Sequence, residues 1–389
     1  MKLPNIKNKH TLLILTSVLL GCIILVSLFF LTLELRYRSI EKKITDISPE
    51  ISEDYYFNQL TYKEQLLYKT IRDAAKKHSE KTDILPYKFT ENEFVRSVKA
   101  VNFDYPEFFY LDFNSVDLYC DNYKTVVYID YFTSESETAQ MNMELEAVCA
   151  AAEAVAAKYD SDFEKTVALH DFLTSVCIYI NQNSNENSEN LHTSYGALVD
   201  KKASCDGYAS AFKILLNRCG IECIIAEGTI DGMPHLWNIV KQNGKYYHID
   251  CTWNDADVDS LSDLSFHGFF NLSDRAVLQD RKPDKTFKMP VCNDETNYYT
   301  TIEARAESLE KLEEVAYIQL KNAVENKSIY FEFLPDFTCD EADFKKHLLS
   351  AIDKINSEYS SPVLSRSYRL YDTSVGGYAY TVQIYYINN

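Results

Sequence analysis

The stretch from Ser194 to Asn254 constrains the fold more than any other part of the chain, because a helix start and a tight hairpin turn lie close together in it. From Cys205 to Cys219, apolar residues recur at intervals of three and four, which predicts a helix. Gly220 is a natural stop, since glycine readily adopts the left-handed conformation that closes a helix. Cys205 is therefore expected at the helix N-terminus, where unpaired N–H groups and the helix dipole favour a thiolate over a thiol.

The second signal is an Asn-Gly pair at 243–244, which predicts a two-residue hairpin turn between two alternating segments. Counting outward from this turn sets Trp237 opposite Asp250 and His235 opposite Thr252. His235 and Asp250 then share one face of the hairpin as diagonal neighbours, roughly 7–8 Å apart at the backbone. An imidazole and a carboxylate bridge that distance, as an Asp must do to orient a general-base His.

Three motifs carry these residues. They are Cys205-Asp-Gly207-Tyr208-Ala209 at the helix start, His235-Leu-Trp237, and Asp250-Cys-Thr252-Trp253. In type, order and intervening elements they resemble the C-x-G-[YF]-[AS], H-x-W and D-x-T-W blocks of the transglutaminase-like superfamily. The resemblance covers roughly residues 160–274, including the HGFFNLSD segment. Three blocks separated by a helix and a hairpin make a specific signal.

The resemblance implies an α+β fold with a papain-like core, in which a Cys at a helix N-terminus packs against an antiparallel sheet that carries the His and the Asp. It implies Cys205 as nucleophile, His235 as general base and acid, and Asp250 as the residue that orients the ring. The supporting residues of the cleft would be Gly207, Tyr208, Trp237 and Trp253.

The chemistry implied is a cysteine acyl-enzyme formed on a protein or peptide amide, with no cofactor. Water as acceptor gives hydrolysis or deamidation, and a lysine amine gives crosslinking; the motifs do not choose between them. The alternative is a catalytically idle fold that serves as an extracytoplasmic peptide-binding or assembly module. His248 shares the face of His235, and we expect it to be structural. Cys251 is expected on the opposite face of its strand.

Metal sites are not expected. Cys219-x3-Cys223 has no second pair of ligands, so structural zinc is disfavoured. The stretch from Asp255 begins like a calcium loop, but Ser260 replaces the required Gly and Phe266 the closing Glu. The calcium use of some animal transglutaminases is therefore not carried over.

The N-terminus predicts a membrane anchor. Residues 12–33 form an uncharged apolar run, about 33 Å long as a helix and long enough to cross a bilayer. Lys2, Lys7 and Lys9 precede it and favour a cytoplasmic N-terminus of residues 1–11. We expect a single-pass protein of the cell membrane with its catalytic domain outside the cytoplasm. A lipoprotein cleavage box at residues 19–22 is the rival interpretation, disfavoured because the residues after Cys22 are apolar.

Residue patterns divide the chain after the apolar run into a linker and three folded regions. We expect a linker at 34–53, a small α+β region at 54–135, a transglutaminase-like catalytic domain at 136–290 and a C-terminal α/β accessory domain at 300–389. The helix predicted at 160–178 has Asp162 as its expected cap. The Asn- and Ser-rich stretch 181–194 is expected to be a surface loop that leads toward Cys205. The C-terminal domain shows the order helix, strand, helix, strand, strand.

Net charge and cysteine content limit the classes of partner and scaffold that we expect. A formal net charge of −19 disfavours nucleic acid, whose phosphates require clustered Lys and Arg. Ten cysteines in 389 residues are too few for a disulfide-framed scaffold. The expected partners are the membrane, through the apolar helix, and a protein or peptide substrate, including cell-wall peptides. The sequence leaves the oligomeric state open.

Overall fold

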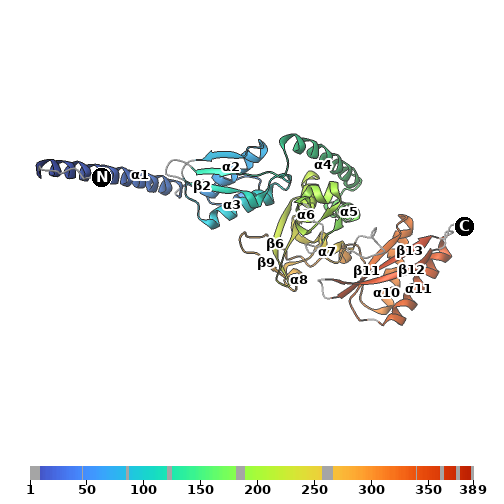
Figure 1. The fold of residues 1–389 in the computed structure, drawn as a ribbon. Coiled ribbons are helices and arrows are strands. Elements are labelled where there is room, and N and C mark those ends of the chain that lie inside the picture. The colour runs from blue at the N-terminus through green and yellow to red at the C-terminus, as the bar shows by residue number, and fades with distance from the viewer. Residues whose placement is uncertain are drawn as a thin grey trace, which may run out of the picture. The chain divides into compact units, whose positions relative to one another are not determined.

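The fold is taken from a computed structural model that describes residues 9–45, 47–84, 87–120, 125–180, 189–255, 266–338, 340–359, 363–373 and 377–386. The chain separates into two compact units (Figure 1). One comprises Met1–Asp104 and Leu111–Tyr131, and the other Tyr105–Tyr110 and Phe132–Asn389.

The first unit begins with the long helix α1 (Lys9–Thr45). Within it, the segment Leu12–Arg36 is long and apolar enough to cross a membrane, and none of it is buried by the protein. The helix continues past residue 33, so it includes the first part of the segment expected as a linker.

Beyond α1, the first unit has a three-stranded antiparallel sheet in the order β1-β3-β2 and two main helices. The elements are η1 (Phe57–Gln59), α2 (Tyr62–Lys76), β1 (Lys81–Ile84), α3 (Glu91–Asp104), η2 (Phe113–Ser115), β2 (Asp117–Cys120) and β3 (Thr125–Tyr128).

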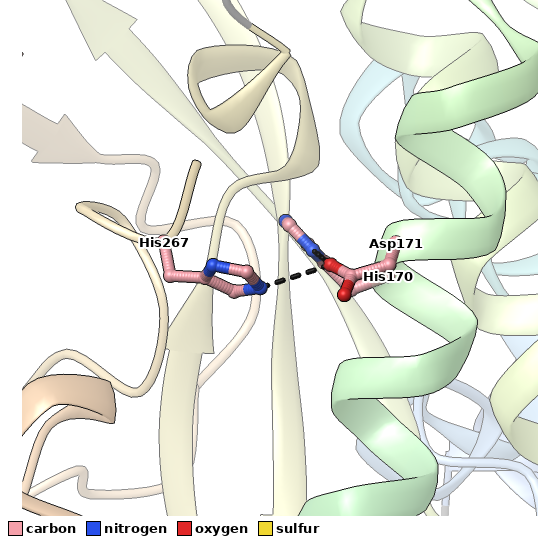
Figure 2. A group of neighbouring side chains, drawn as sticks. All are labelled: His170, Asp171 and His267. Carbon is pink, nitrogen blue, oxygen red and sulfur yellow. Dashed lines mark hydrogen bonds and ion pairs between the residues drawn. The ribbon is translucent and has the colours of Figure 1, made fainter. Parts of the chain in front are cut away.

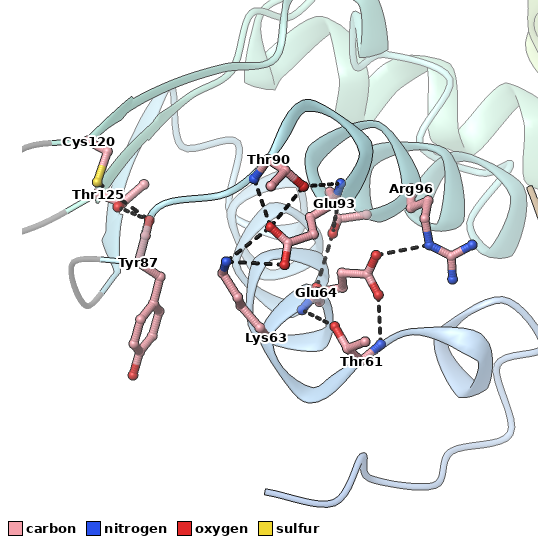
Figure 3. A network of polar contacts seen from close by, with 10 residues as sticks. Thr61, Lys63, Glu64, Tyr87, Thr90, Glu93, Arg96, Cys120 and Thr125 are labelled. Atoms are coloured by element: carbon pink, nitrogen blue, oxygen red, sulfur yellow. Dashed lines mark hydrogen bonds and ion pairs between the residues drawn. The ribbon is translucent and has the colours of Figure 1, made fainter. Parts of the chain in front are cut away.

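Helices α2 and α3 are joined by partly buried ion pairs (Figure 3). Thr61 and Glu64 form a capping box that begins α2. The same Glu64 accepts from the guanidinium of Arg96 on α3 at 2.9 Å. One residue earlier, Lys63 donates to both carboxylate oxygens of Glu93, at 3.0 and 3.1 Å. The charged residues of this unit thus hold its two helices together.

The second unit contains the sheet β8-β7-β6-β9, which is antiparallel throughout. Its strands are β6 (Cys223–Ile230), β7 (Met233–Gln242), β8 (Lys245–Ile249) and β9 (Arg281–Pro283). The helices around it are α4 (Glu135–Ala156), α5 (Asp162–Val176), α6 (Cys205–Arg218), α7 (Cys251–Asn254), α8 (Asp274–Val277) and α9 (Tyr298–Thr301). Between α5 and α6 lie β4 (Ile178–Tyr179), η3 (Glu189–His192), the π-helical turn η4 (Gly196–Asp200) and β5 (Lys202–Ala203), with β4 and β5 paired in parallel.

The predicted hairpin register is confirmed from Gln242–Lys245 to Asn238–Ile249, but the expected strand pairs Trp237–Asp250 and His235–Thr252 are not part of the β7–β8 ladder. Gln242 pairs with Lys245 and Asn238 with Ile249, and Asn243 and Gly244 both have positive φ, at 49° and 79°. The strand is shorter than expected, however. It ends at Ile249, because the next residue turns into the helix α7.

Two local predictions are corrected by helix caps. Asp250 is the N-cap of α7, so Cys251 and Thr252 are helical and not part of a strand. The cap of α5 is Ser161, not Asp162, because Ser161 is extended and accepts from the backbone N–H of Glu164. The side chain of Glu164 completes that capping box.

The C-terminal part confirms the predicted order of helix, strand, helix and two strands. It comprises α10 (Leu309–Glu325), β11 (Tyr330–Pro335), α11 (Glu341–Glu358), β12 (Val363–Thr373) and β13 (Gly377–Tyr386). A short strand that was not predicted, β10 (Arg305–Ala306), extends the sheet to the order β10-β11-β13-β12. Phe344 of α11 stacks on Tyr380 of β13, with ring centroids 3.8 Å apart, and this contact joins helix and sheet.

Candidate active site

Cys205 is the first residue of α6, as predicted, and its side chain is buried. The helix lies against the hairpin, since Asn238 of β7 donates to the carbonyl of Ala209 at 2.9 Å. Ser204 precedes the helix in extended conformation, and its hydroxyl donates to Asp206 instead of capping the helix. Ser204 therefore does not cap α6, and the N–H of Gly207 donates instead to Oδ1 of Asp206 at 3.1 Å. The N–H of Cys205, at the start of the helix, is suited to face a reacting carbonyl oxygen.

Gly207 is required by a close approach of the chain. A Cβ at this position would lie 2.8 Å from the carbonyl oxygen of Leu191 and 2.9 Å from that of Thr193. Glycine thus lets the η3 segment pack directly on the first turn of α6. Tyr208, the next residue, is fully buried, and its hydroxyl hydrogen-bonds to Asp255.

His235 and Asp250 are in direct contact. Nε2 of the ring lies 2.7 Å from Oδ2 of the carboxylate, and both side chains are buried. The side chain of Cys205 is hydrogen-bonded to the same ring. Since Asp250 occupies Nε2, Nδ1 is the ring nitrogen left for an interaction with the sulfur. The structure therefore brings together the three residues that the sequence predicted, from the start of α6, from β7 and from the start of α7.

The opposite charges of His235 and Asp250 stabilise each other. Burial opposes protonation of His235, but the Asp250 carboxylate and then Cys205 outweigh it and raise the pKa of the ring to about 10. Burial also opposes ionisation of Asp250. Nevertheless, the positive charges of His235 and Arg281 hold the pKa of its carboxyl well below the usual range. An imidazolium beside Cys205 is the arrangement that stabilises a thiolate.

Arg281 belongs to this group and was missed by the sequence analysis. Its Nη2 donates to Oδ2 of Asp250 at 2.7 Å, the same oxygen that faces His235. Arginine in a three-residue strand has no periodicity that would have signalled its burial. A polar residue on the edge of a sheet is more often a surface residue.

Trp237 is held in place by a second histidine. Its indole N–H donates to Nδ1 of His248 at 2.9 Å, and Nε2 of His248 faces Asp274 at 2.9 Å. The ring of Trp237 stacks beside His235, with centroids 6.1 Å apart and planes 16° apart. His248 therefore has a structural contact, as expected. Trp253, also expected in the cleft, is 46% exposed and packs against Phe269.

Among the described residues, two groups of side chains have ligand atoms close enough for a metal ion, and one of them is His170, Asp171 and His267 (Figure 2). The backbone N–H of Phe269 fixes the oxygen of the Asn254 amide, so its NH₂ faces Nε2 of His170 at 3.0 Å. His170 then carries its proton on Nδ1 and donates to Asp171, which leaves no lone pair at the position facing the cluster.

His267 is equally unsuited to bind a metal. Its Nδ1 lies 2.7 Å from Glu332 and its Nε2 2.9 Å from Asp171, so both nitrogens donate to carboxylates. Burial opposes protonation, but Asp171 and Glu332 raise the pKa of His267 to about 10. An imidazolium has no lone pair for a metal.

The second group is His248, Asp274 and Cys292. Trp237 donates to Nδ1 of His248, so Nε2 carries the proton and donates to Asp274. Both groups are therefore hydrogen-bonded networks and not metal sites. The segments 181–188 and 256–265, which include most of the predicted surface loop and the Asp-rich stretch, lie outside the described residues.

Similar proteins were found for this region. Residues 150–251 match the model of the Transglutaminase-like superfamily. "Kyphoscoliosis peptidase" of Mus musculus is 24% identical over 140 residues, which cover 32% of this chain and 21% of the relative. Its counterpart in Homo sapiens is 27% identical over 103 residues, 22% of this chain and 16% of the relative. The chain thus spans about a fifth of the length of these curated relatives.

Two solved structures are also similar. A TGase crystal structure is 15% identical with a TM-score of 0.27, covering 46% of this chain and 52% of its own. A candidate cysteine protease from Cytophaga hutchinsonii is 12% identical with a TM-score of 0.24, covering 36% and 61%. The family model covers α6 and the hairpin, and with them the motifs of Cys205 and His235 and the first two residues of the motif that begins at Asp250. The chain therefore contains a domain of the transglutaminase-like superfamily.

Proposed function

We propose that this protein is a membrane-anchored thiol enzyme that forms an acyl-enzyme at Cys205 from a protein or peptide amide. The observation that carries the proposal is one contact. The ring of His235 lies 2.7 Å from the carboxylate of Asp250 and also interacts with the side chain of Cys205, which raises the pKa of the ring. A nucleophile, a general base and a group that orients the base are the three parts that covalent acyl transfer requires.

In the proposed reaction, the Cys205 thiolate attacks the amide carbonyl carbon, and the carbonyl oxygen becomes an oxyanion. The backbone N–H of Cys205 is a donor suited to that oxyanion, because it belongs to the first turn of α6. His235 then gives its proton to the departing amine, and the C–N bond breaks. Asp250 holds the ring in the tautomer and orientation that these transfers need.

The acyl-enzyme is resolved by an acceptor. Neutral His235 takes a proton from water or from an amine, which attacks the thioester. The C–S bond then breaks and releases the Cys205 thiolate beside the protonated ring, which restores the starting ion pair. Water yields a carboxylic acid, and a lysine amine yields a new amide. The curated relatives are named as peptidases, which favours water as the acceptor here.

The apolar part of α1 supports the anchoring half of the proposal, since it is long enough to span a bilayer and is not covered by the protein. The lysines at positions 2, 7 and 9 favour an N-terminus inside the cell. The catalytic domain would then face the outside, where its substrates are surface proteins or cell-wall peptides.

Mass spectrometry tests the activity and the acceptor together. The full chain in detergent is incubated with a glutamine-bearing peptide and a primary amine. Ammonia loss with amine gain, simple deamidation and backbone cleavage give three different mass changes. We expect one of them in the wild type and in Cys251→Ala, with the acyl group mapped to Cys205, and none in Cys205→Ala.

Cys251 is the matched control because it is a second buried cysteine close to the site, next to Asp250 in sequence. Burial raises the pKa of its thiol well above the ordinary value, so it is a poor nucleophile. Turnover that survives in Cys205→Ala would contradict the proposal, and a folded wild type without any acyl-enzyme would support a peptide-binding module instead. A membrane-impermeant thiol label on intact cells tests orientation, and no labelling of Cys205 there would contradict an outside location.

A further inference from the structure

Arg281 is a charged side chain that the fold buries completely. Arg281 as a whole is 2% exposed, and among the fully buried side chains of the described residues only that of Trp237 is larger. A buried charge costs free energy unless it is paired and hydrogen-bonded, so its position needs a specific reason.

The strand β9 brings Arg281 to the site through a close backbone approach. In this strand Arg281 pairs with Ile230 of β6, and Pro283 pairs with Gly228. A Cβ at residue 228 would lie 2.5 Å from the carbonyl oxygen of Lys282 and 2.9 Å from the Trp237 ring. Glycine at this position therefore lets β9 close on the sheet beside Trp237.

Both terminal nitrogens of the guanidinium are bonded to carboxylates. Nη2 donates to Oδ2 of Asp250 at 2.7 Å, and Nη1 donates to both oxygens of Asp280 at 2.6 and 2.7 Å. Three aromatic rings surround the group at 5.0 to 5.9 Å, those of Phe269, Trp253 and Trp237. These contacts fix both the place and the orientation of the charge.

A charge count shows what Arg281 adds. In the ion-pair form, the Cys205 thiolate and the Asp250 carboxylate are two negative charges that share one imidazolium, His235. Arg281 supplies the second positive charge, so the four innermost groups sum to zero. Asp280, whose side chain is 34% exposed, lies behind Arg281 and is partly solvated.

We infer that Arg281 is a positioning residue of the active site, which neutralises and fixes Asp250 so that the charge of His235 remains available to the Cys205 thiolate. The inference rests on the proposed function, since it assigns a role within that reaction. Arg281 acts through Asp250 and does not touch the substrate.

Other ionisable groups also face the site. Tyr179 on β4 is electrostatically coupled to Cys205, Asp250 and Asp206. His170 on α5 is coupled to Asp250, and His248 on β8 is coupled to Arg281. These groups are unchanged in the variants proposed below, so they act as a constant background.

The test is the pH dependence of alkylation of Cys205 by iodoacetamide, followed by peptide mapping in the full chain in detergent. The alkylation rate should change in two pH ranges, which we call the two limbs of the profile. On the acid limb the rate rises as the Cys205–His235 ion pair forms, and on the alkaline limb it changes again as the imidazolium loses its proton. Removing the positive charge in Arg281→Met disfavours both deprotonations, so both limbs move to higher pH, by about one unit or more. At a pH on the acid limb, alkylation then falls about tenfold. Arg281→Lys keeps the charge and should leave the limbs near their wild-type positions.

Two further variants sharpen the test. Asp280→Asn removes the negative charge behind Arg281, so it should move the limbs the opposite way, to lower pH, and by less because Asp280 is partly exposed. Arg218→Met changes the net charge as Arg281→Met does, but at the far end of α6, where Arg218 pairs with Glu146 and Glu153. It should leave the profile unchanged.

Limbs that stay at the wild-type pH in Arg281→Met and in Asp280→Asn would overturn the inference, even if the labelled fraction falls. A purely structural role would lower that fraction and the melting temperature without moving the limbs. If Arg281→Met does not fold, the shift in Asp280→Asn and the unshifted profile of Arg281→Lys decide. A wild type whose Cys205 is no more reactive than the other thiols would instead contradict the proposed function itself.

Discussion

The carboxylate of Asp250 does three things at once. Its Oδ1 accepts from the backbone N–H of Trp253 and so begins α7. Its Oδ2 accepts from the ring of His235 and from Arg281, each at 2.7 Å. Each oxygen therefore faces at least one N–H donor, and only an ionised carboxylate can accept all of these bonds. The residue that orients the base is also a helix cap, which ties the geometry of the site to the local fold.

Asp250→Asn is predicted to fail as a conservative replacement. Whichever way the amide is turned, its NH₂ faces an N–H of Trp253 or those of His235 and Arg281. In one orientation the ring of His235 loses its acceptor, and in both it loses the negative charge that stabilises the imidazolium, so we expect kcat to fall by roughly 10²–10⁴ with little change in KM. Steady-state kinetics with the substrate found by mass spectrometry measures this. Asp284→Asn, an exposed carboxylate in the turn after β9, is the control and should retain full activity. A wild-type kcat in Asp250→Asn would contradict the assigned role.

At the scale of elements, the first turn of α6 and the η3 segment form one packed unit around Gly207. Ser204 donates its backbone N–H to the carbonyl of Leu191 at 2.9 Å, so η3 is also bonded to the residue before Cys205. The position of the nucleophile therefore depends on a segment that precedes it by more than ten residues.

Gly207→Ala should push this segment away. The added Cβ meets two backbone carbonyl oxygens at 2.8 and 2.9 Å, and these cannot move as a flexible side chain would. We expect a loss of about 1–3 kcal/mol in stability and a marked fall in alkylation of Cys205, measured by thermal melting and peptide mapping. Gly220→Ala is the control, since its Cβ meets nothing within 4 Å and the cost is backbone strain at φ +75°. It should lose about 1–2 kcal/mol without loss of reactivity. Equal reactivity in both variants would refute the role of η3.

The sequence predicted this site where the information is local. An Asn-Gly turn sets the register of a hairpin by itself, so counting residues placed His235 and Asp250 near the same end of the hairpin. Their direct contact also depends on Asp250 capping α7, beyond the end of the strand. Arg281 could not be found in this way, because β9 has three residues and its partner is chosen by tertiary packing. Ser161 and Asp162 are both good caps, and only the backbone conformation distinguishes them. The end of β8 at Ile249 could not be predicted for the same reason, because it depends on the backbone conformation in which Asp250 caps α7.

At the scale of the whole second unit, a buried ion network joins the C-terminal strands to the catalytic core. The sequence suggested no chemistry for this domain. Glu332 of β11 accepts from His267 at 2.7 Å and from Thr381 of β13 at 3.0 Å. His267 in turn bonds Asp171 of α5, and Tyr298 stacks on its ring at 3.9 Å. The C-terminal domain thus supplies a second counter-ion for His267, beside Asp171 of the core.

Glu332→Gln is predicted to destabilise this unit, and by an amount that depends on pH. The pKa of His267 is raised from 6.5 to about 10 in the folded protein, so its pair contributes full stability below pH 6.5 and loses it as the pH rises toward 10. The wild type should lose about 1.4 kcal/mol per pH unit from this proton across that window. Glu332→Gln should unfold about 3 kcal/mol more easily at neutral pH and show a flatter pH dependence, because the raised pKa of His267 depends on two carboxylates. Urea titration followed by tryptophan fluorescence reports this, since both tryptophans, Trp237 and Trp253, lie in the catalytic core.

Glu313→Gln is the control. It breaks a more exposed Glu–His pair in the C-terminal domain, with His347, and should cost less than about 1 kcal/mol. Similar losses in the two variants, with parallel pH dependences, would show that the bond from Glu332 to His267 does not join the domain to the core.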